Sequence, residues 1–147
     1  MMPLTLIELG MDTRLVILAA GLMFLWALLL GVVKFQQILA SPEGQAHPYT
    51  DIAHRAALLY AFALMLIAVF VQLSAWRMTI DLTAAGVLAF FFVAAVASYM
   101  AHGLRRDTAN QLVNPSAGTR LFVWVLAVGE IVAFAILLAG FIVNAFA

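Results

Sequence analysis

Residues 15–33 read LVILAAGLMFLWALLLGVV, a run of nineteen residues with neither a charged side chain nor a proline. Arg14 and Lys34 bracket this run. At 1.5 Å per residue, a helix of this length is about 30 Å long, which matches the hydrocarbon core of a bilayer. The stretch therefore predicts a helix that crosses a membrane.

Three further apolar runs follow, at about residues 56–76, 82–103 and 121–145. Each is long enough to cross the hydrocarbon core once. Four such spans in 147 residues leave no room for a soluble domain. The sequence therefore predicts an all-α protein, an antiparallel four-helix bundle in which residues 1–147 form a single transmembrane domain.

The composition supports a membrane location. Hydrophobic residues make up 67% of the chain and charged residues 10%, with a mean hydropathy of +1.13. A soluble domain has about a quarter charged residues, because they cover its surface. The composition therefore argues against a soluble enzyme, and the net charge of zero argues against a nucleic-acid partner. The chain has no cysteine, which excludes disulfides and thiolate metal sites.

The segment before the first span, residues 1–13, lacks the features of a signal peptide. It contains Glu8 and Asp12, has no basic start and shows no small-residue cleavage site. We expect it to form a short turn or helix at the membrane interface.

The basic residues predict the orientation of the bundle. The two longer loops and their flanks carry Lys34, Arg55, Arg105, Arg106 and Arg120. The opposite side carries only Arg14 and Arg77. Basic residues are enriched in cytoplasmic loops, so we expect both longer loops in the cytoplasm and both termini outside. The expected location is the cytoplasmic membrane of a bacterium.

Polar side chains gather at the predicted cytoplasmic ends of the spans. One interpretation is a basic flank that anchors the helices to anionic membrane lipid. The other is a cationic cleft that holds an anionic head group, because arginine binds carboxylate or phosphate with two hydrogen bonds. The candidate ligand-binding residues are Lys34, His54, Arg55, Tyr99, His102 and Arg105.

Two histidines lie at similar depth on neighbouring helices. His54 precedes the second span and His102 lies near the end of the third. Such a pair could ligate a haem or a metal ion. Only Asp51 and Asp107 are nearby carboxylates, and haem usually lies deeper in the membrane. We therefore expect interfacial histidines with local hydrogen bonds and no metal site.

Glu130 is the most unusual residue of the fourth span. It follows Arg120 by ten residues, so it lies about 15 Å deep. An ionisable group at this depth is a functional candidate, because it is costly unless it is paired or protonated. The alternatives are proton chemistry and a structural hydrogen bond of the neutral side chain. The partner of that bond would be Tyr60, Ser98 or a backbone carbonyl, on a neighbouring helix or across a subunit contact.

The layout resembles that of the MAPEG family, membrane-associated proteins of eicosanoid and glutathione metabolism. Residues 51–56, DIAHRA, are similar to the acidic and arginine motif that opens the second span of the family. Residues 98–106, SYMAHGLRR, are similar to the aromatic and arginine stretch that ends its third span, and Lys34 closes the first. The resemblance implies a trimer with a cleft that holds glutathione and a lipophilic substrate.

The sequence also departs from the MAPEG pattern. Leu59 stands where the family has an asparagine that contacts glutathione, and Ile52 stands where it has an arginine. Glu130 is not part of the pattern. These departures put glutathione conjugation in doubt, while the bundle and its cleft remain as expectations.

Three classes of function stay open at this point. The first is a MAPEG-like protein that binds an anionic thiol or lipophilic ligand at the cytoplasmic face. Such a protein could be a glutathione-transferase-like enzyme. The second is a non-catalytic membrane subunit or scaffold that binds partner helices. The third is a membrane anchor that handles haem or protons. Membrane lipid and further copies of the chain are the expected partners.

Overall fold

The computed structural model describes residues 8–147, which form four α-helices and contain no strand. The helices are α1 (Met11–Ala40), α2 (Pro48–Gln72), α3 (Met78–Arg105) and α4 (Ala117–Phe146). All four are long and apolar enough to cross a membrane. The predicted all-α bundle with four candidate spans is therefore confirmed. Most of the expected interfacial segment falls on residues 1–7, outside the described residues.

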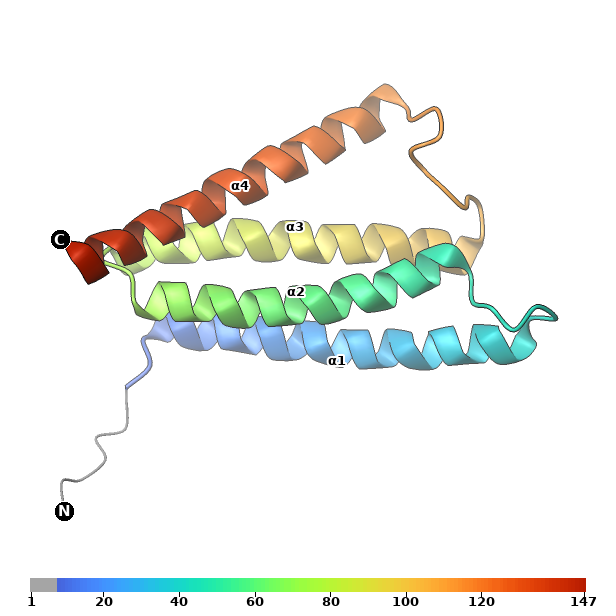
Figure 1. Cartoon of the computed structure of the whole chain (residues 1–147), viewed down its shortest axis with the longest axis horizontal. Helices are drawn as coiled ribbons and strands as arrows, with labels where there is room; N and C mark the ends of the chain where they lie inside the picture. Colours follow the sequence, from blue (N-terminus) through green and yellow to red (C-terminus); the bar gives the residue numbers. More distant parts are fainter. Residues whose placement is uncertain (1–7) are drawn as a thin grey trace, which may run out of the picture.

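Helices α1, α2 and α3 lie side by side and alternate in direction (Figure 1). One end of the bundle carries the 73–77 turn, the start of α1 and the end of α4, and we call it the turn end. The other end carries the loops 41–47 and 106–116, and we call it the loop end. The predicted cytoplasmic side corresponds to the loop end.

The pairing of α1 with α2 follows a seven-residue repeat. The buried core residues of α1 are spaced alternately by four and three positions, and those of α2 from Ala57 onward, apart from Ile67, have the same spacing. This spacing keeps one face of each helix on its partner, as in a left-handed coiled coil. Small side chains in the repeat allow a close approach of the two backbones. The residues are Val16, Ala20, Met23, Ala27 and Leu30 in α1, and Ala57, Ala61, Leu64, Ala68 and Val71 in α2.

The loop between α1 and α2 is shorter than the sequence predicts. Helix α1 continues seven residues beyond Val33 and ends at Ala40. Ser41 is extended, with φ −92° and ψ 130°, because Pro42 disfavours a helical conformation at the residue before it. The chain re-enters a helix at Pro48, a position where the absent N–H costs nothing.

The turn between α2 and α3 is displaced from its predicted position. Helix α2 ends at Gln72, not at Trp76, and α3 begins at Met78. Hydrogen bonds to α4 hold the intervening residues outside the helices. Ala75 N–H donates to the Gly140 carbonyl at 3.1 Å, and the Trp76 indole donates to the Ile136 carbonyl at 2.8 Å. These bonds fix the turn onto the C-terminal half of α4.

Helix α4 packs on the bundle through one half only. Its buried residues, Ala133, Leu137 and Gly140, all lie in its C-terminal half. Toward the loop end, α4 diverges from α3 (Figure 1). The helices are close at Gly129, where an added Cβ would lie 2.5 Å from the ring of Phe91. Glu130 therefore lies beside the point from which the two helices separate.

Candidate functional site

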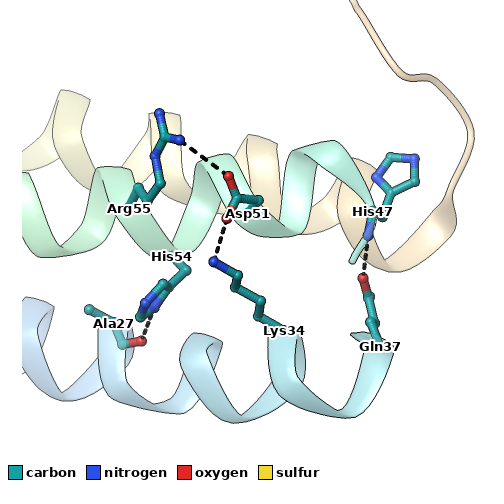
Figure 2. A network of polar contacts seen from close by, with 7 residues as sticks. All are labelled: Ala27, Lys34, Gln37, His47, Asp51, His54 and Arg55. Carbon is teal, nitrogen blue, oxygen red and sulfur yellow. Dashed lines mark hydrogen bonds and ion pairs between the residues drawn. The ribbon is translucent and has the colours of Figure 1, made fainter. Parts of the chain in front are cut away.

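The first polar cluster at the loop end joins α1 to α2. The ammonium group of Lys34 pairs with one carboxylate oxygen of Asp51, and a guanidinium nitrogen of Arg55 lies 3.4 Å from the other (Figure 2). The Lys34 side chain is 30% exposed and that of Arg55 is 70% exposed. We call these three residues the ion-pair cluster. Two cations share one carboxylate, so the cluster keeps one positive charge available to an anion.

His54 faces α1 and not α3. Its Nδ1 lies 2.9 Å from the Ala27 carbonyl oxygen (Figure 2). A carbonyl only accepts, so Nδ1 carries the proton and donates it. Gly31 makes room for the ring, since an added Cβ would lie 3.0 Å from His54 Cε1. His54 therefore has the local hydrogen bond of an interfacial histidine.

The second polar cluster surrounds Tyr49 between α2 and α3. Tyr49 is 5% exposed, and its ring centroid lies 5.9 Å from that of Tyr99 and 5.3 Å from that of His102. Its hydroxyl accepts a hydrogen bond from the Gln111 backbone N–H at 2.8 Å, which ties the 106–116 loop to α2. We call Tyr49, Tyr99 and His102 the aromatic cluster. Sequence analysis missed Tyr49, although Pro48 at the start of a helix was a signal for its place in the first turn.

His102 also closes the end of α3. Its Nδ1 donates a hydrogen bond to a carboxylate oxygen of Asp107 at 2.7 Å. This hydrogen bond lowers the pKa of the Asp107 carboxyl below its ordinary value, because it stabilises the charged form. Between the two residues the chain turns at Arg106, which has a left-handed conformation with φ 53°.

The candidate ligand-binding residues lie in separate places at the loop end. Tyr99 and His102 come together on Tyr49, whereas Arg55 pairs with Asp51. Arg105 is exposed at the end of α3. Within residues 8–147, no hydrogen bond or ion pair links Arg55 or Arg105 to the aromatic cluster. The loop end therefore presents two separate polar clusters.

Arg106 contributes to a cavity that the sequence did not predict. The cavity has a volume of about 330 Å³ and lies between the end of α3 and the loop 41–47. Glu43 and His47 also line it, so the walls carry both signs of charge. The Gln37 side chain supports this loop by accepting the His47 backbone N–H at 3.0 Å (Figure 2).

Glu130 lies in a different cavity, between α2, α3 and α4. This cavity has a volume of about 270 Å³. Its other lining residues are apolar: Ala63, Leu66, Ile67, Leu88, Phe92, Ile131 and Phe134. Glu130 Oε1 is buried and has no hydrogen-bond partner among the described residues. The expected bond to Tyr60 or Ser98 is thus missing at this oxygen, and Tyr60 instead stacks on Phe92 with ring centroids 4.2 Å apart.

A haem or metal ion finds little support in these contacts. His54 donates to α1 and His102 to Asp107, so the two rings are directed to different neighbours. A haem held between them would require both rings to leave these partners. In the described part of the chain, no group of three histidine or carboxylate side chains is arranged to hold a metal ion.

Comparison of this chain with protein-family models, with curated proteins and with solved structures finds no match. The two polar clusters at the loop end and the cavity beside Glu130 are therefore the features that indicate a function.

Proposed function

We propose that this chain is a membrane-embedded binding protein for an amphipathic ligand with an anionic head group. The ligand's apolar chain occupies the cavity between α2, α3 and α4, and its head group lies at the loop end. The observation that carries the proposal is the cavity beside Glu130, where seven apolar side chains surround one carboxyl group with an unpaired buried oxygen. An apolar cavity with a single polar group is typical of a site that orients a lipophilic molecule.

The divergence of α4 supplies a route into this cavity from the loop end. The first half of α4 has no buried residue, and this part of the helix diverges from α3 toward the loop end (Figure 1). Arg105 is exposed at the loop end of α3, and the Tyr99 and His102 rings lie on the turns of the same helix that precede it. An arginine there can hold a carboxylate or phosphate with two hydrogen bonds.

The MAPEG resemblance gives a narrower version of the same proposal. Under it, the ligand is an anionic thiol of the glutathione type with a lipophilic co-substrate, and three copies of the chain form the cleft. The ion-pair cluster supports this version, because Asp51 and Arg55 of the DIAHRA motif hold each other in place. The departures at Ile52 and Leu59 weigh against glutathione itself, so we propose ligand binding and leave catalysis open.

A photoreactive fatty acid tests the binding proposal. We expect a C16 fatty acid with a diazirine in its tail to label the cavity walls, Leu88 and Ile131 above all, when the chain is in lipid nanodiscs. Excess unlabelled fatty acid should compete, and a C16 alcohol should compete less because it lacks the anionic head. Mass spectrometry of the labelled peptides reads the result.

Arginine variants provide the control for this experiment. Arg105→Ala should reduce the competed label, whereas Arg14→Ala, which removes a basic residue at the turn end, should not. Labelling spread over all lipid-facing helices, and unaffected by competition, would contradict a defined site.

A second candidate function is that of a membrane subunit that binds a partner helix. It is favoured by the apolar side chains on the first half of α4, where Trp124 is 71% exposed. Lipid covers such a face equally well, because hydrocarbon and apolar side chains are alike in polarity. We therefore place this function second.

We further propose that the loop end is cytoplasmic and that both termini are outside, in the cytoplasmic membrane of a bacterium. The absence of cysteine from the sequence permits single-cysteine variants. A membrane-impermeant maleimide applied to intact cells should label Ala147→Cys and should not label Ser41→Cys until the membrane is opened. The reverse pattern would overturn this orientation.

A further inference from the structure

The cavity between α2, α3 and α4 offers one hydrogen-bonding side chain in an otherwise apolar space. Among the described residues that line it, Glu130 alone has a polar side chain. Glu130 Oε1 is buried and has no partner within residues 8–147. Buried polar atoms of folded proteins nearly always have a hydrogen-bond partner, and a bound molecule can be that partner. The chemistry of the cavity walls therefore restricts the group that can bond to Glu130.

Water is a poor occupant of this cavity. A buried water molecule needs several polar partners, and cavities with apolar walls stay dry. Here the carboxyl of Glu130 is the one side-chain partner on offer, and the backbone groups of the surrounding helices are bonded within those helices. A hydrogen-bonding group attached to an apolar molecule is a better match, because the apolar part fills the remaining volume in contact with the walls.

A hydroxyl group suits Glu130 better than an ammonium group does. A hydroxyl both donates and accepts, so it can bond to the carboxyl group in its charged and in its protonated form. An ammonium group has three donors, and no second acceptor side chain lines the cavity among the described residues. It would also bring a further charge into an apolar space, at a large cost in desolvation. The walls therefore favour a neutral hydroxyl group.

The depth of Glu130 places this hydroxyl group within the apolar chain of the ligand. Glu130 lies near the middle of α4, about 20 Å from Ala117 by helix rise. We propose that the ligand is an acyl chain with a mid-chain hydroxyl group that bonds to Glu130. This inference rests on the proposed function, which puts the head group at the loop end and the chain in this cavity. A site with a buried polar group discriminates against an analogue that lacks its partner.

Competition against the photoreactive C16 fatty acid in nanodiscs tests this inference. The competitors are unsubstituted C16 fatty acid and a set of C16 hydroxy acids that differ only in the position of the hydroxyl group. One mid-chain isomer should compete about tenfold better than the unsubstituted acid, as expected for one hydrogen bond in an apolar site. The acid with a methyl branch at that same position should not, because it fills a similar volume without a donor.

Two variants assign the preference to Glu130. It should disappear in Glu130→Leu and persist in Glu43→Leu, which makes the same substitution at an exposed carboxylate of the loop end. If Glu130→Leu fails to fold, the comparison of hydroxyl with methyl branch decides the question.

The outcomes separate this inference from the proposed function. If no fatty acid competes for the label, the proposed function is wrong and the inference falls with it. If the unsubstituted acid competes and no hydroxy isomer or only an isomer matched by its methyl analogue does better, the inference alone is overturned. A preference for hydroxyl that survives in Glu130→Leu would also overturn it.

Discussion

Gly103→Ala is expected to lower the free energy of unfolding by about 1–3 kcal/mol, the range measured for overpacked cores. A Cβ at this position would lie 2.4 Å from Thr50 Oγ1, 2.7 Å from the Thr50 backbone nitrogen and 3.0 Å from its Cα. Backbone atoms cannot rotate away as a side chain can, so α2 and α3 must separate at the loop end. The hydrogen bond from the Gln37 side chain to the Gly103 carbonyl, now 3.3 Å, would lengthen with them.

The same helix offers a matched control in Gly86→Ala. A Cβ at Gly86 would meet no atom within 4 Å. Alanine is more favourable than glycine in a helix by about 1 kcal/mol, so this variant should be neutral or more stable. Reversible unfolding in mixed micelles, followed by circular dichroism, measures both variants. Equal stability of the two would show that the contact between Thr50 and Gly103 is looser than the structure indicates.

The spans were predictable because a bilayer imposes a length and a polarity on any helix that crosses it. Their ends were not, because tertiary contacts set them. The predicted turn at residues 77–81 lies four residues too late, since residues 73–77 are bonded to α4. Asp81 therefore falls inside α3, on the buried face that contains Ala84 and Leu88. Asp81, which the sequence places at the edge of a span, is thus a buried residue within α3.

The candidate site shows the limit of matching residues by depth alone. Arg55 and His102 lie at similar depth, but residues of a helix at one depth point in different directions. Arg55 lies one turn after Asp51 and pairs with it, and His54 points to Ala27. The direction of each side chain depends on the rotation of α2 against α1. The alternating four- and three-residue spacing of buried positions contains this information, and it could have assigned His54 to α1 in advance.

Glu130→Leu is expected to weaken binding of a photoreactive fatty acid that carries a mid-chain hydroxyl group about tenfold, which corresponds to one hydrogen bond of about 1–2 kcal/mol in an apolar site. The reason is that Glu130 Oε1 has no hydrogen-bond partner among the described residues, and a hydroxyl group on the part of the ligand that occupies the cavity can supply one. For the same reason, the substitution removes no known contact of Oε1 within the bundle. The free energy of unfolding should therefore stay within about 0.5 kcal/mol of the wild type. The measurements are competed photolabelling and unfolding of the same preparation.

Two further variants separate the possible roles of Glu130. Glu130→Gln keeps the shape of the side chain and a hydrogen-bonding group, so this variant should retain ligand binding. Ile131→Leu changes the same cavity wall without changing its polarity, and it should also bind the ligand normally. If Glu130→Leu disrupts assembly of several copies and leaves ligand binding unchanged, the unpaired oxygen serves a contact between helices of different chains. If Glu130→Gln is as defective as Glu130→Leu, the ionisable proton is essential. In that case, Glu130 handles a proton, because glutamine preserves the other properties of the side chain.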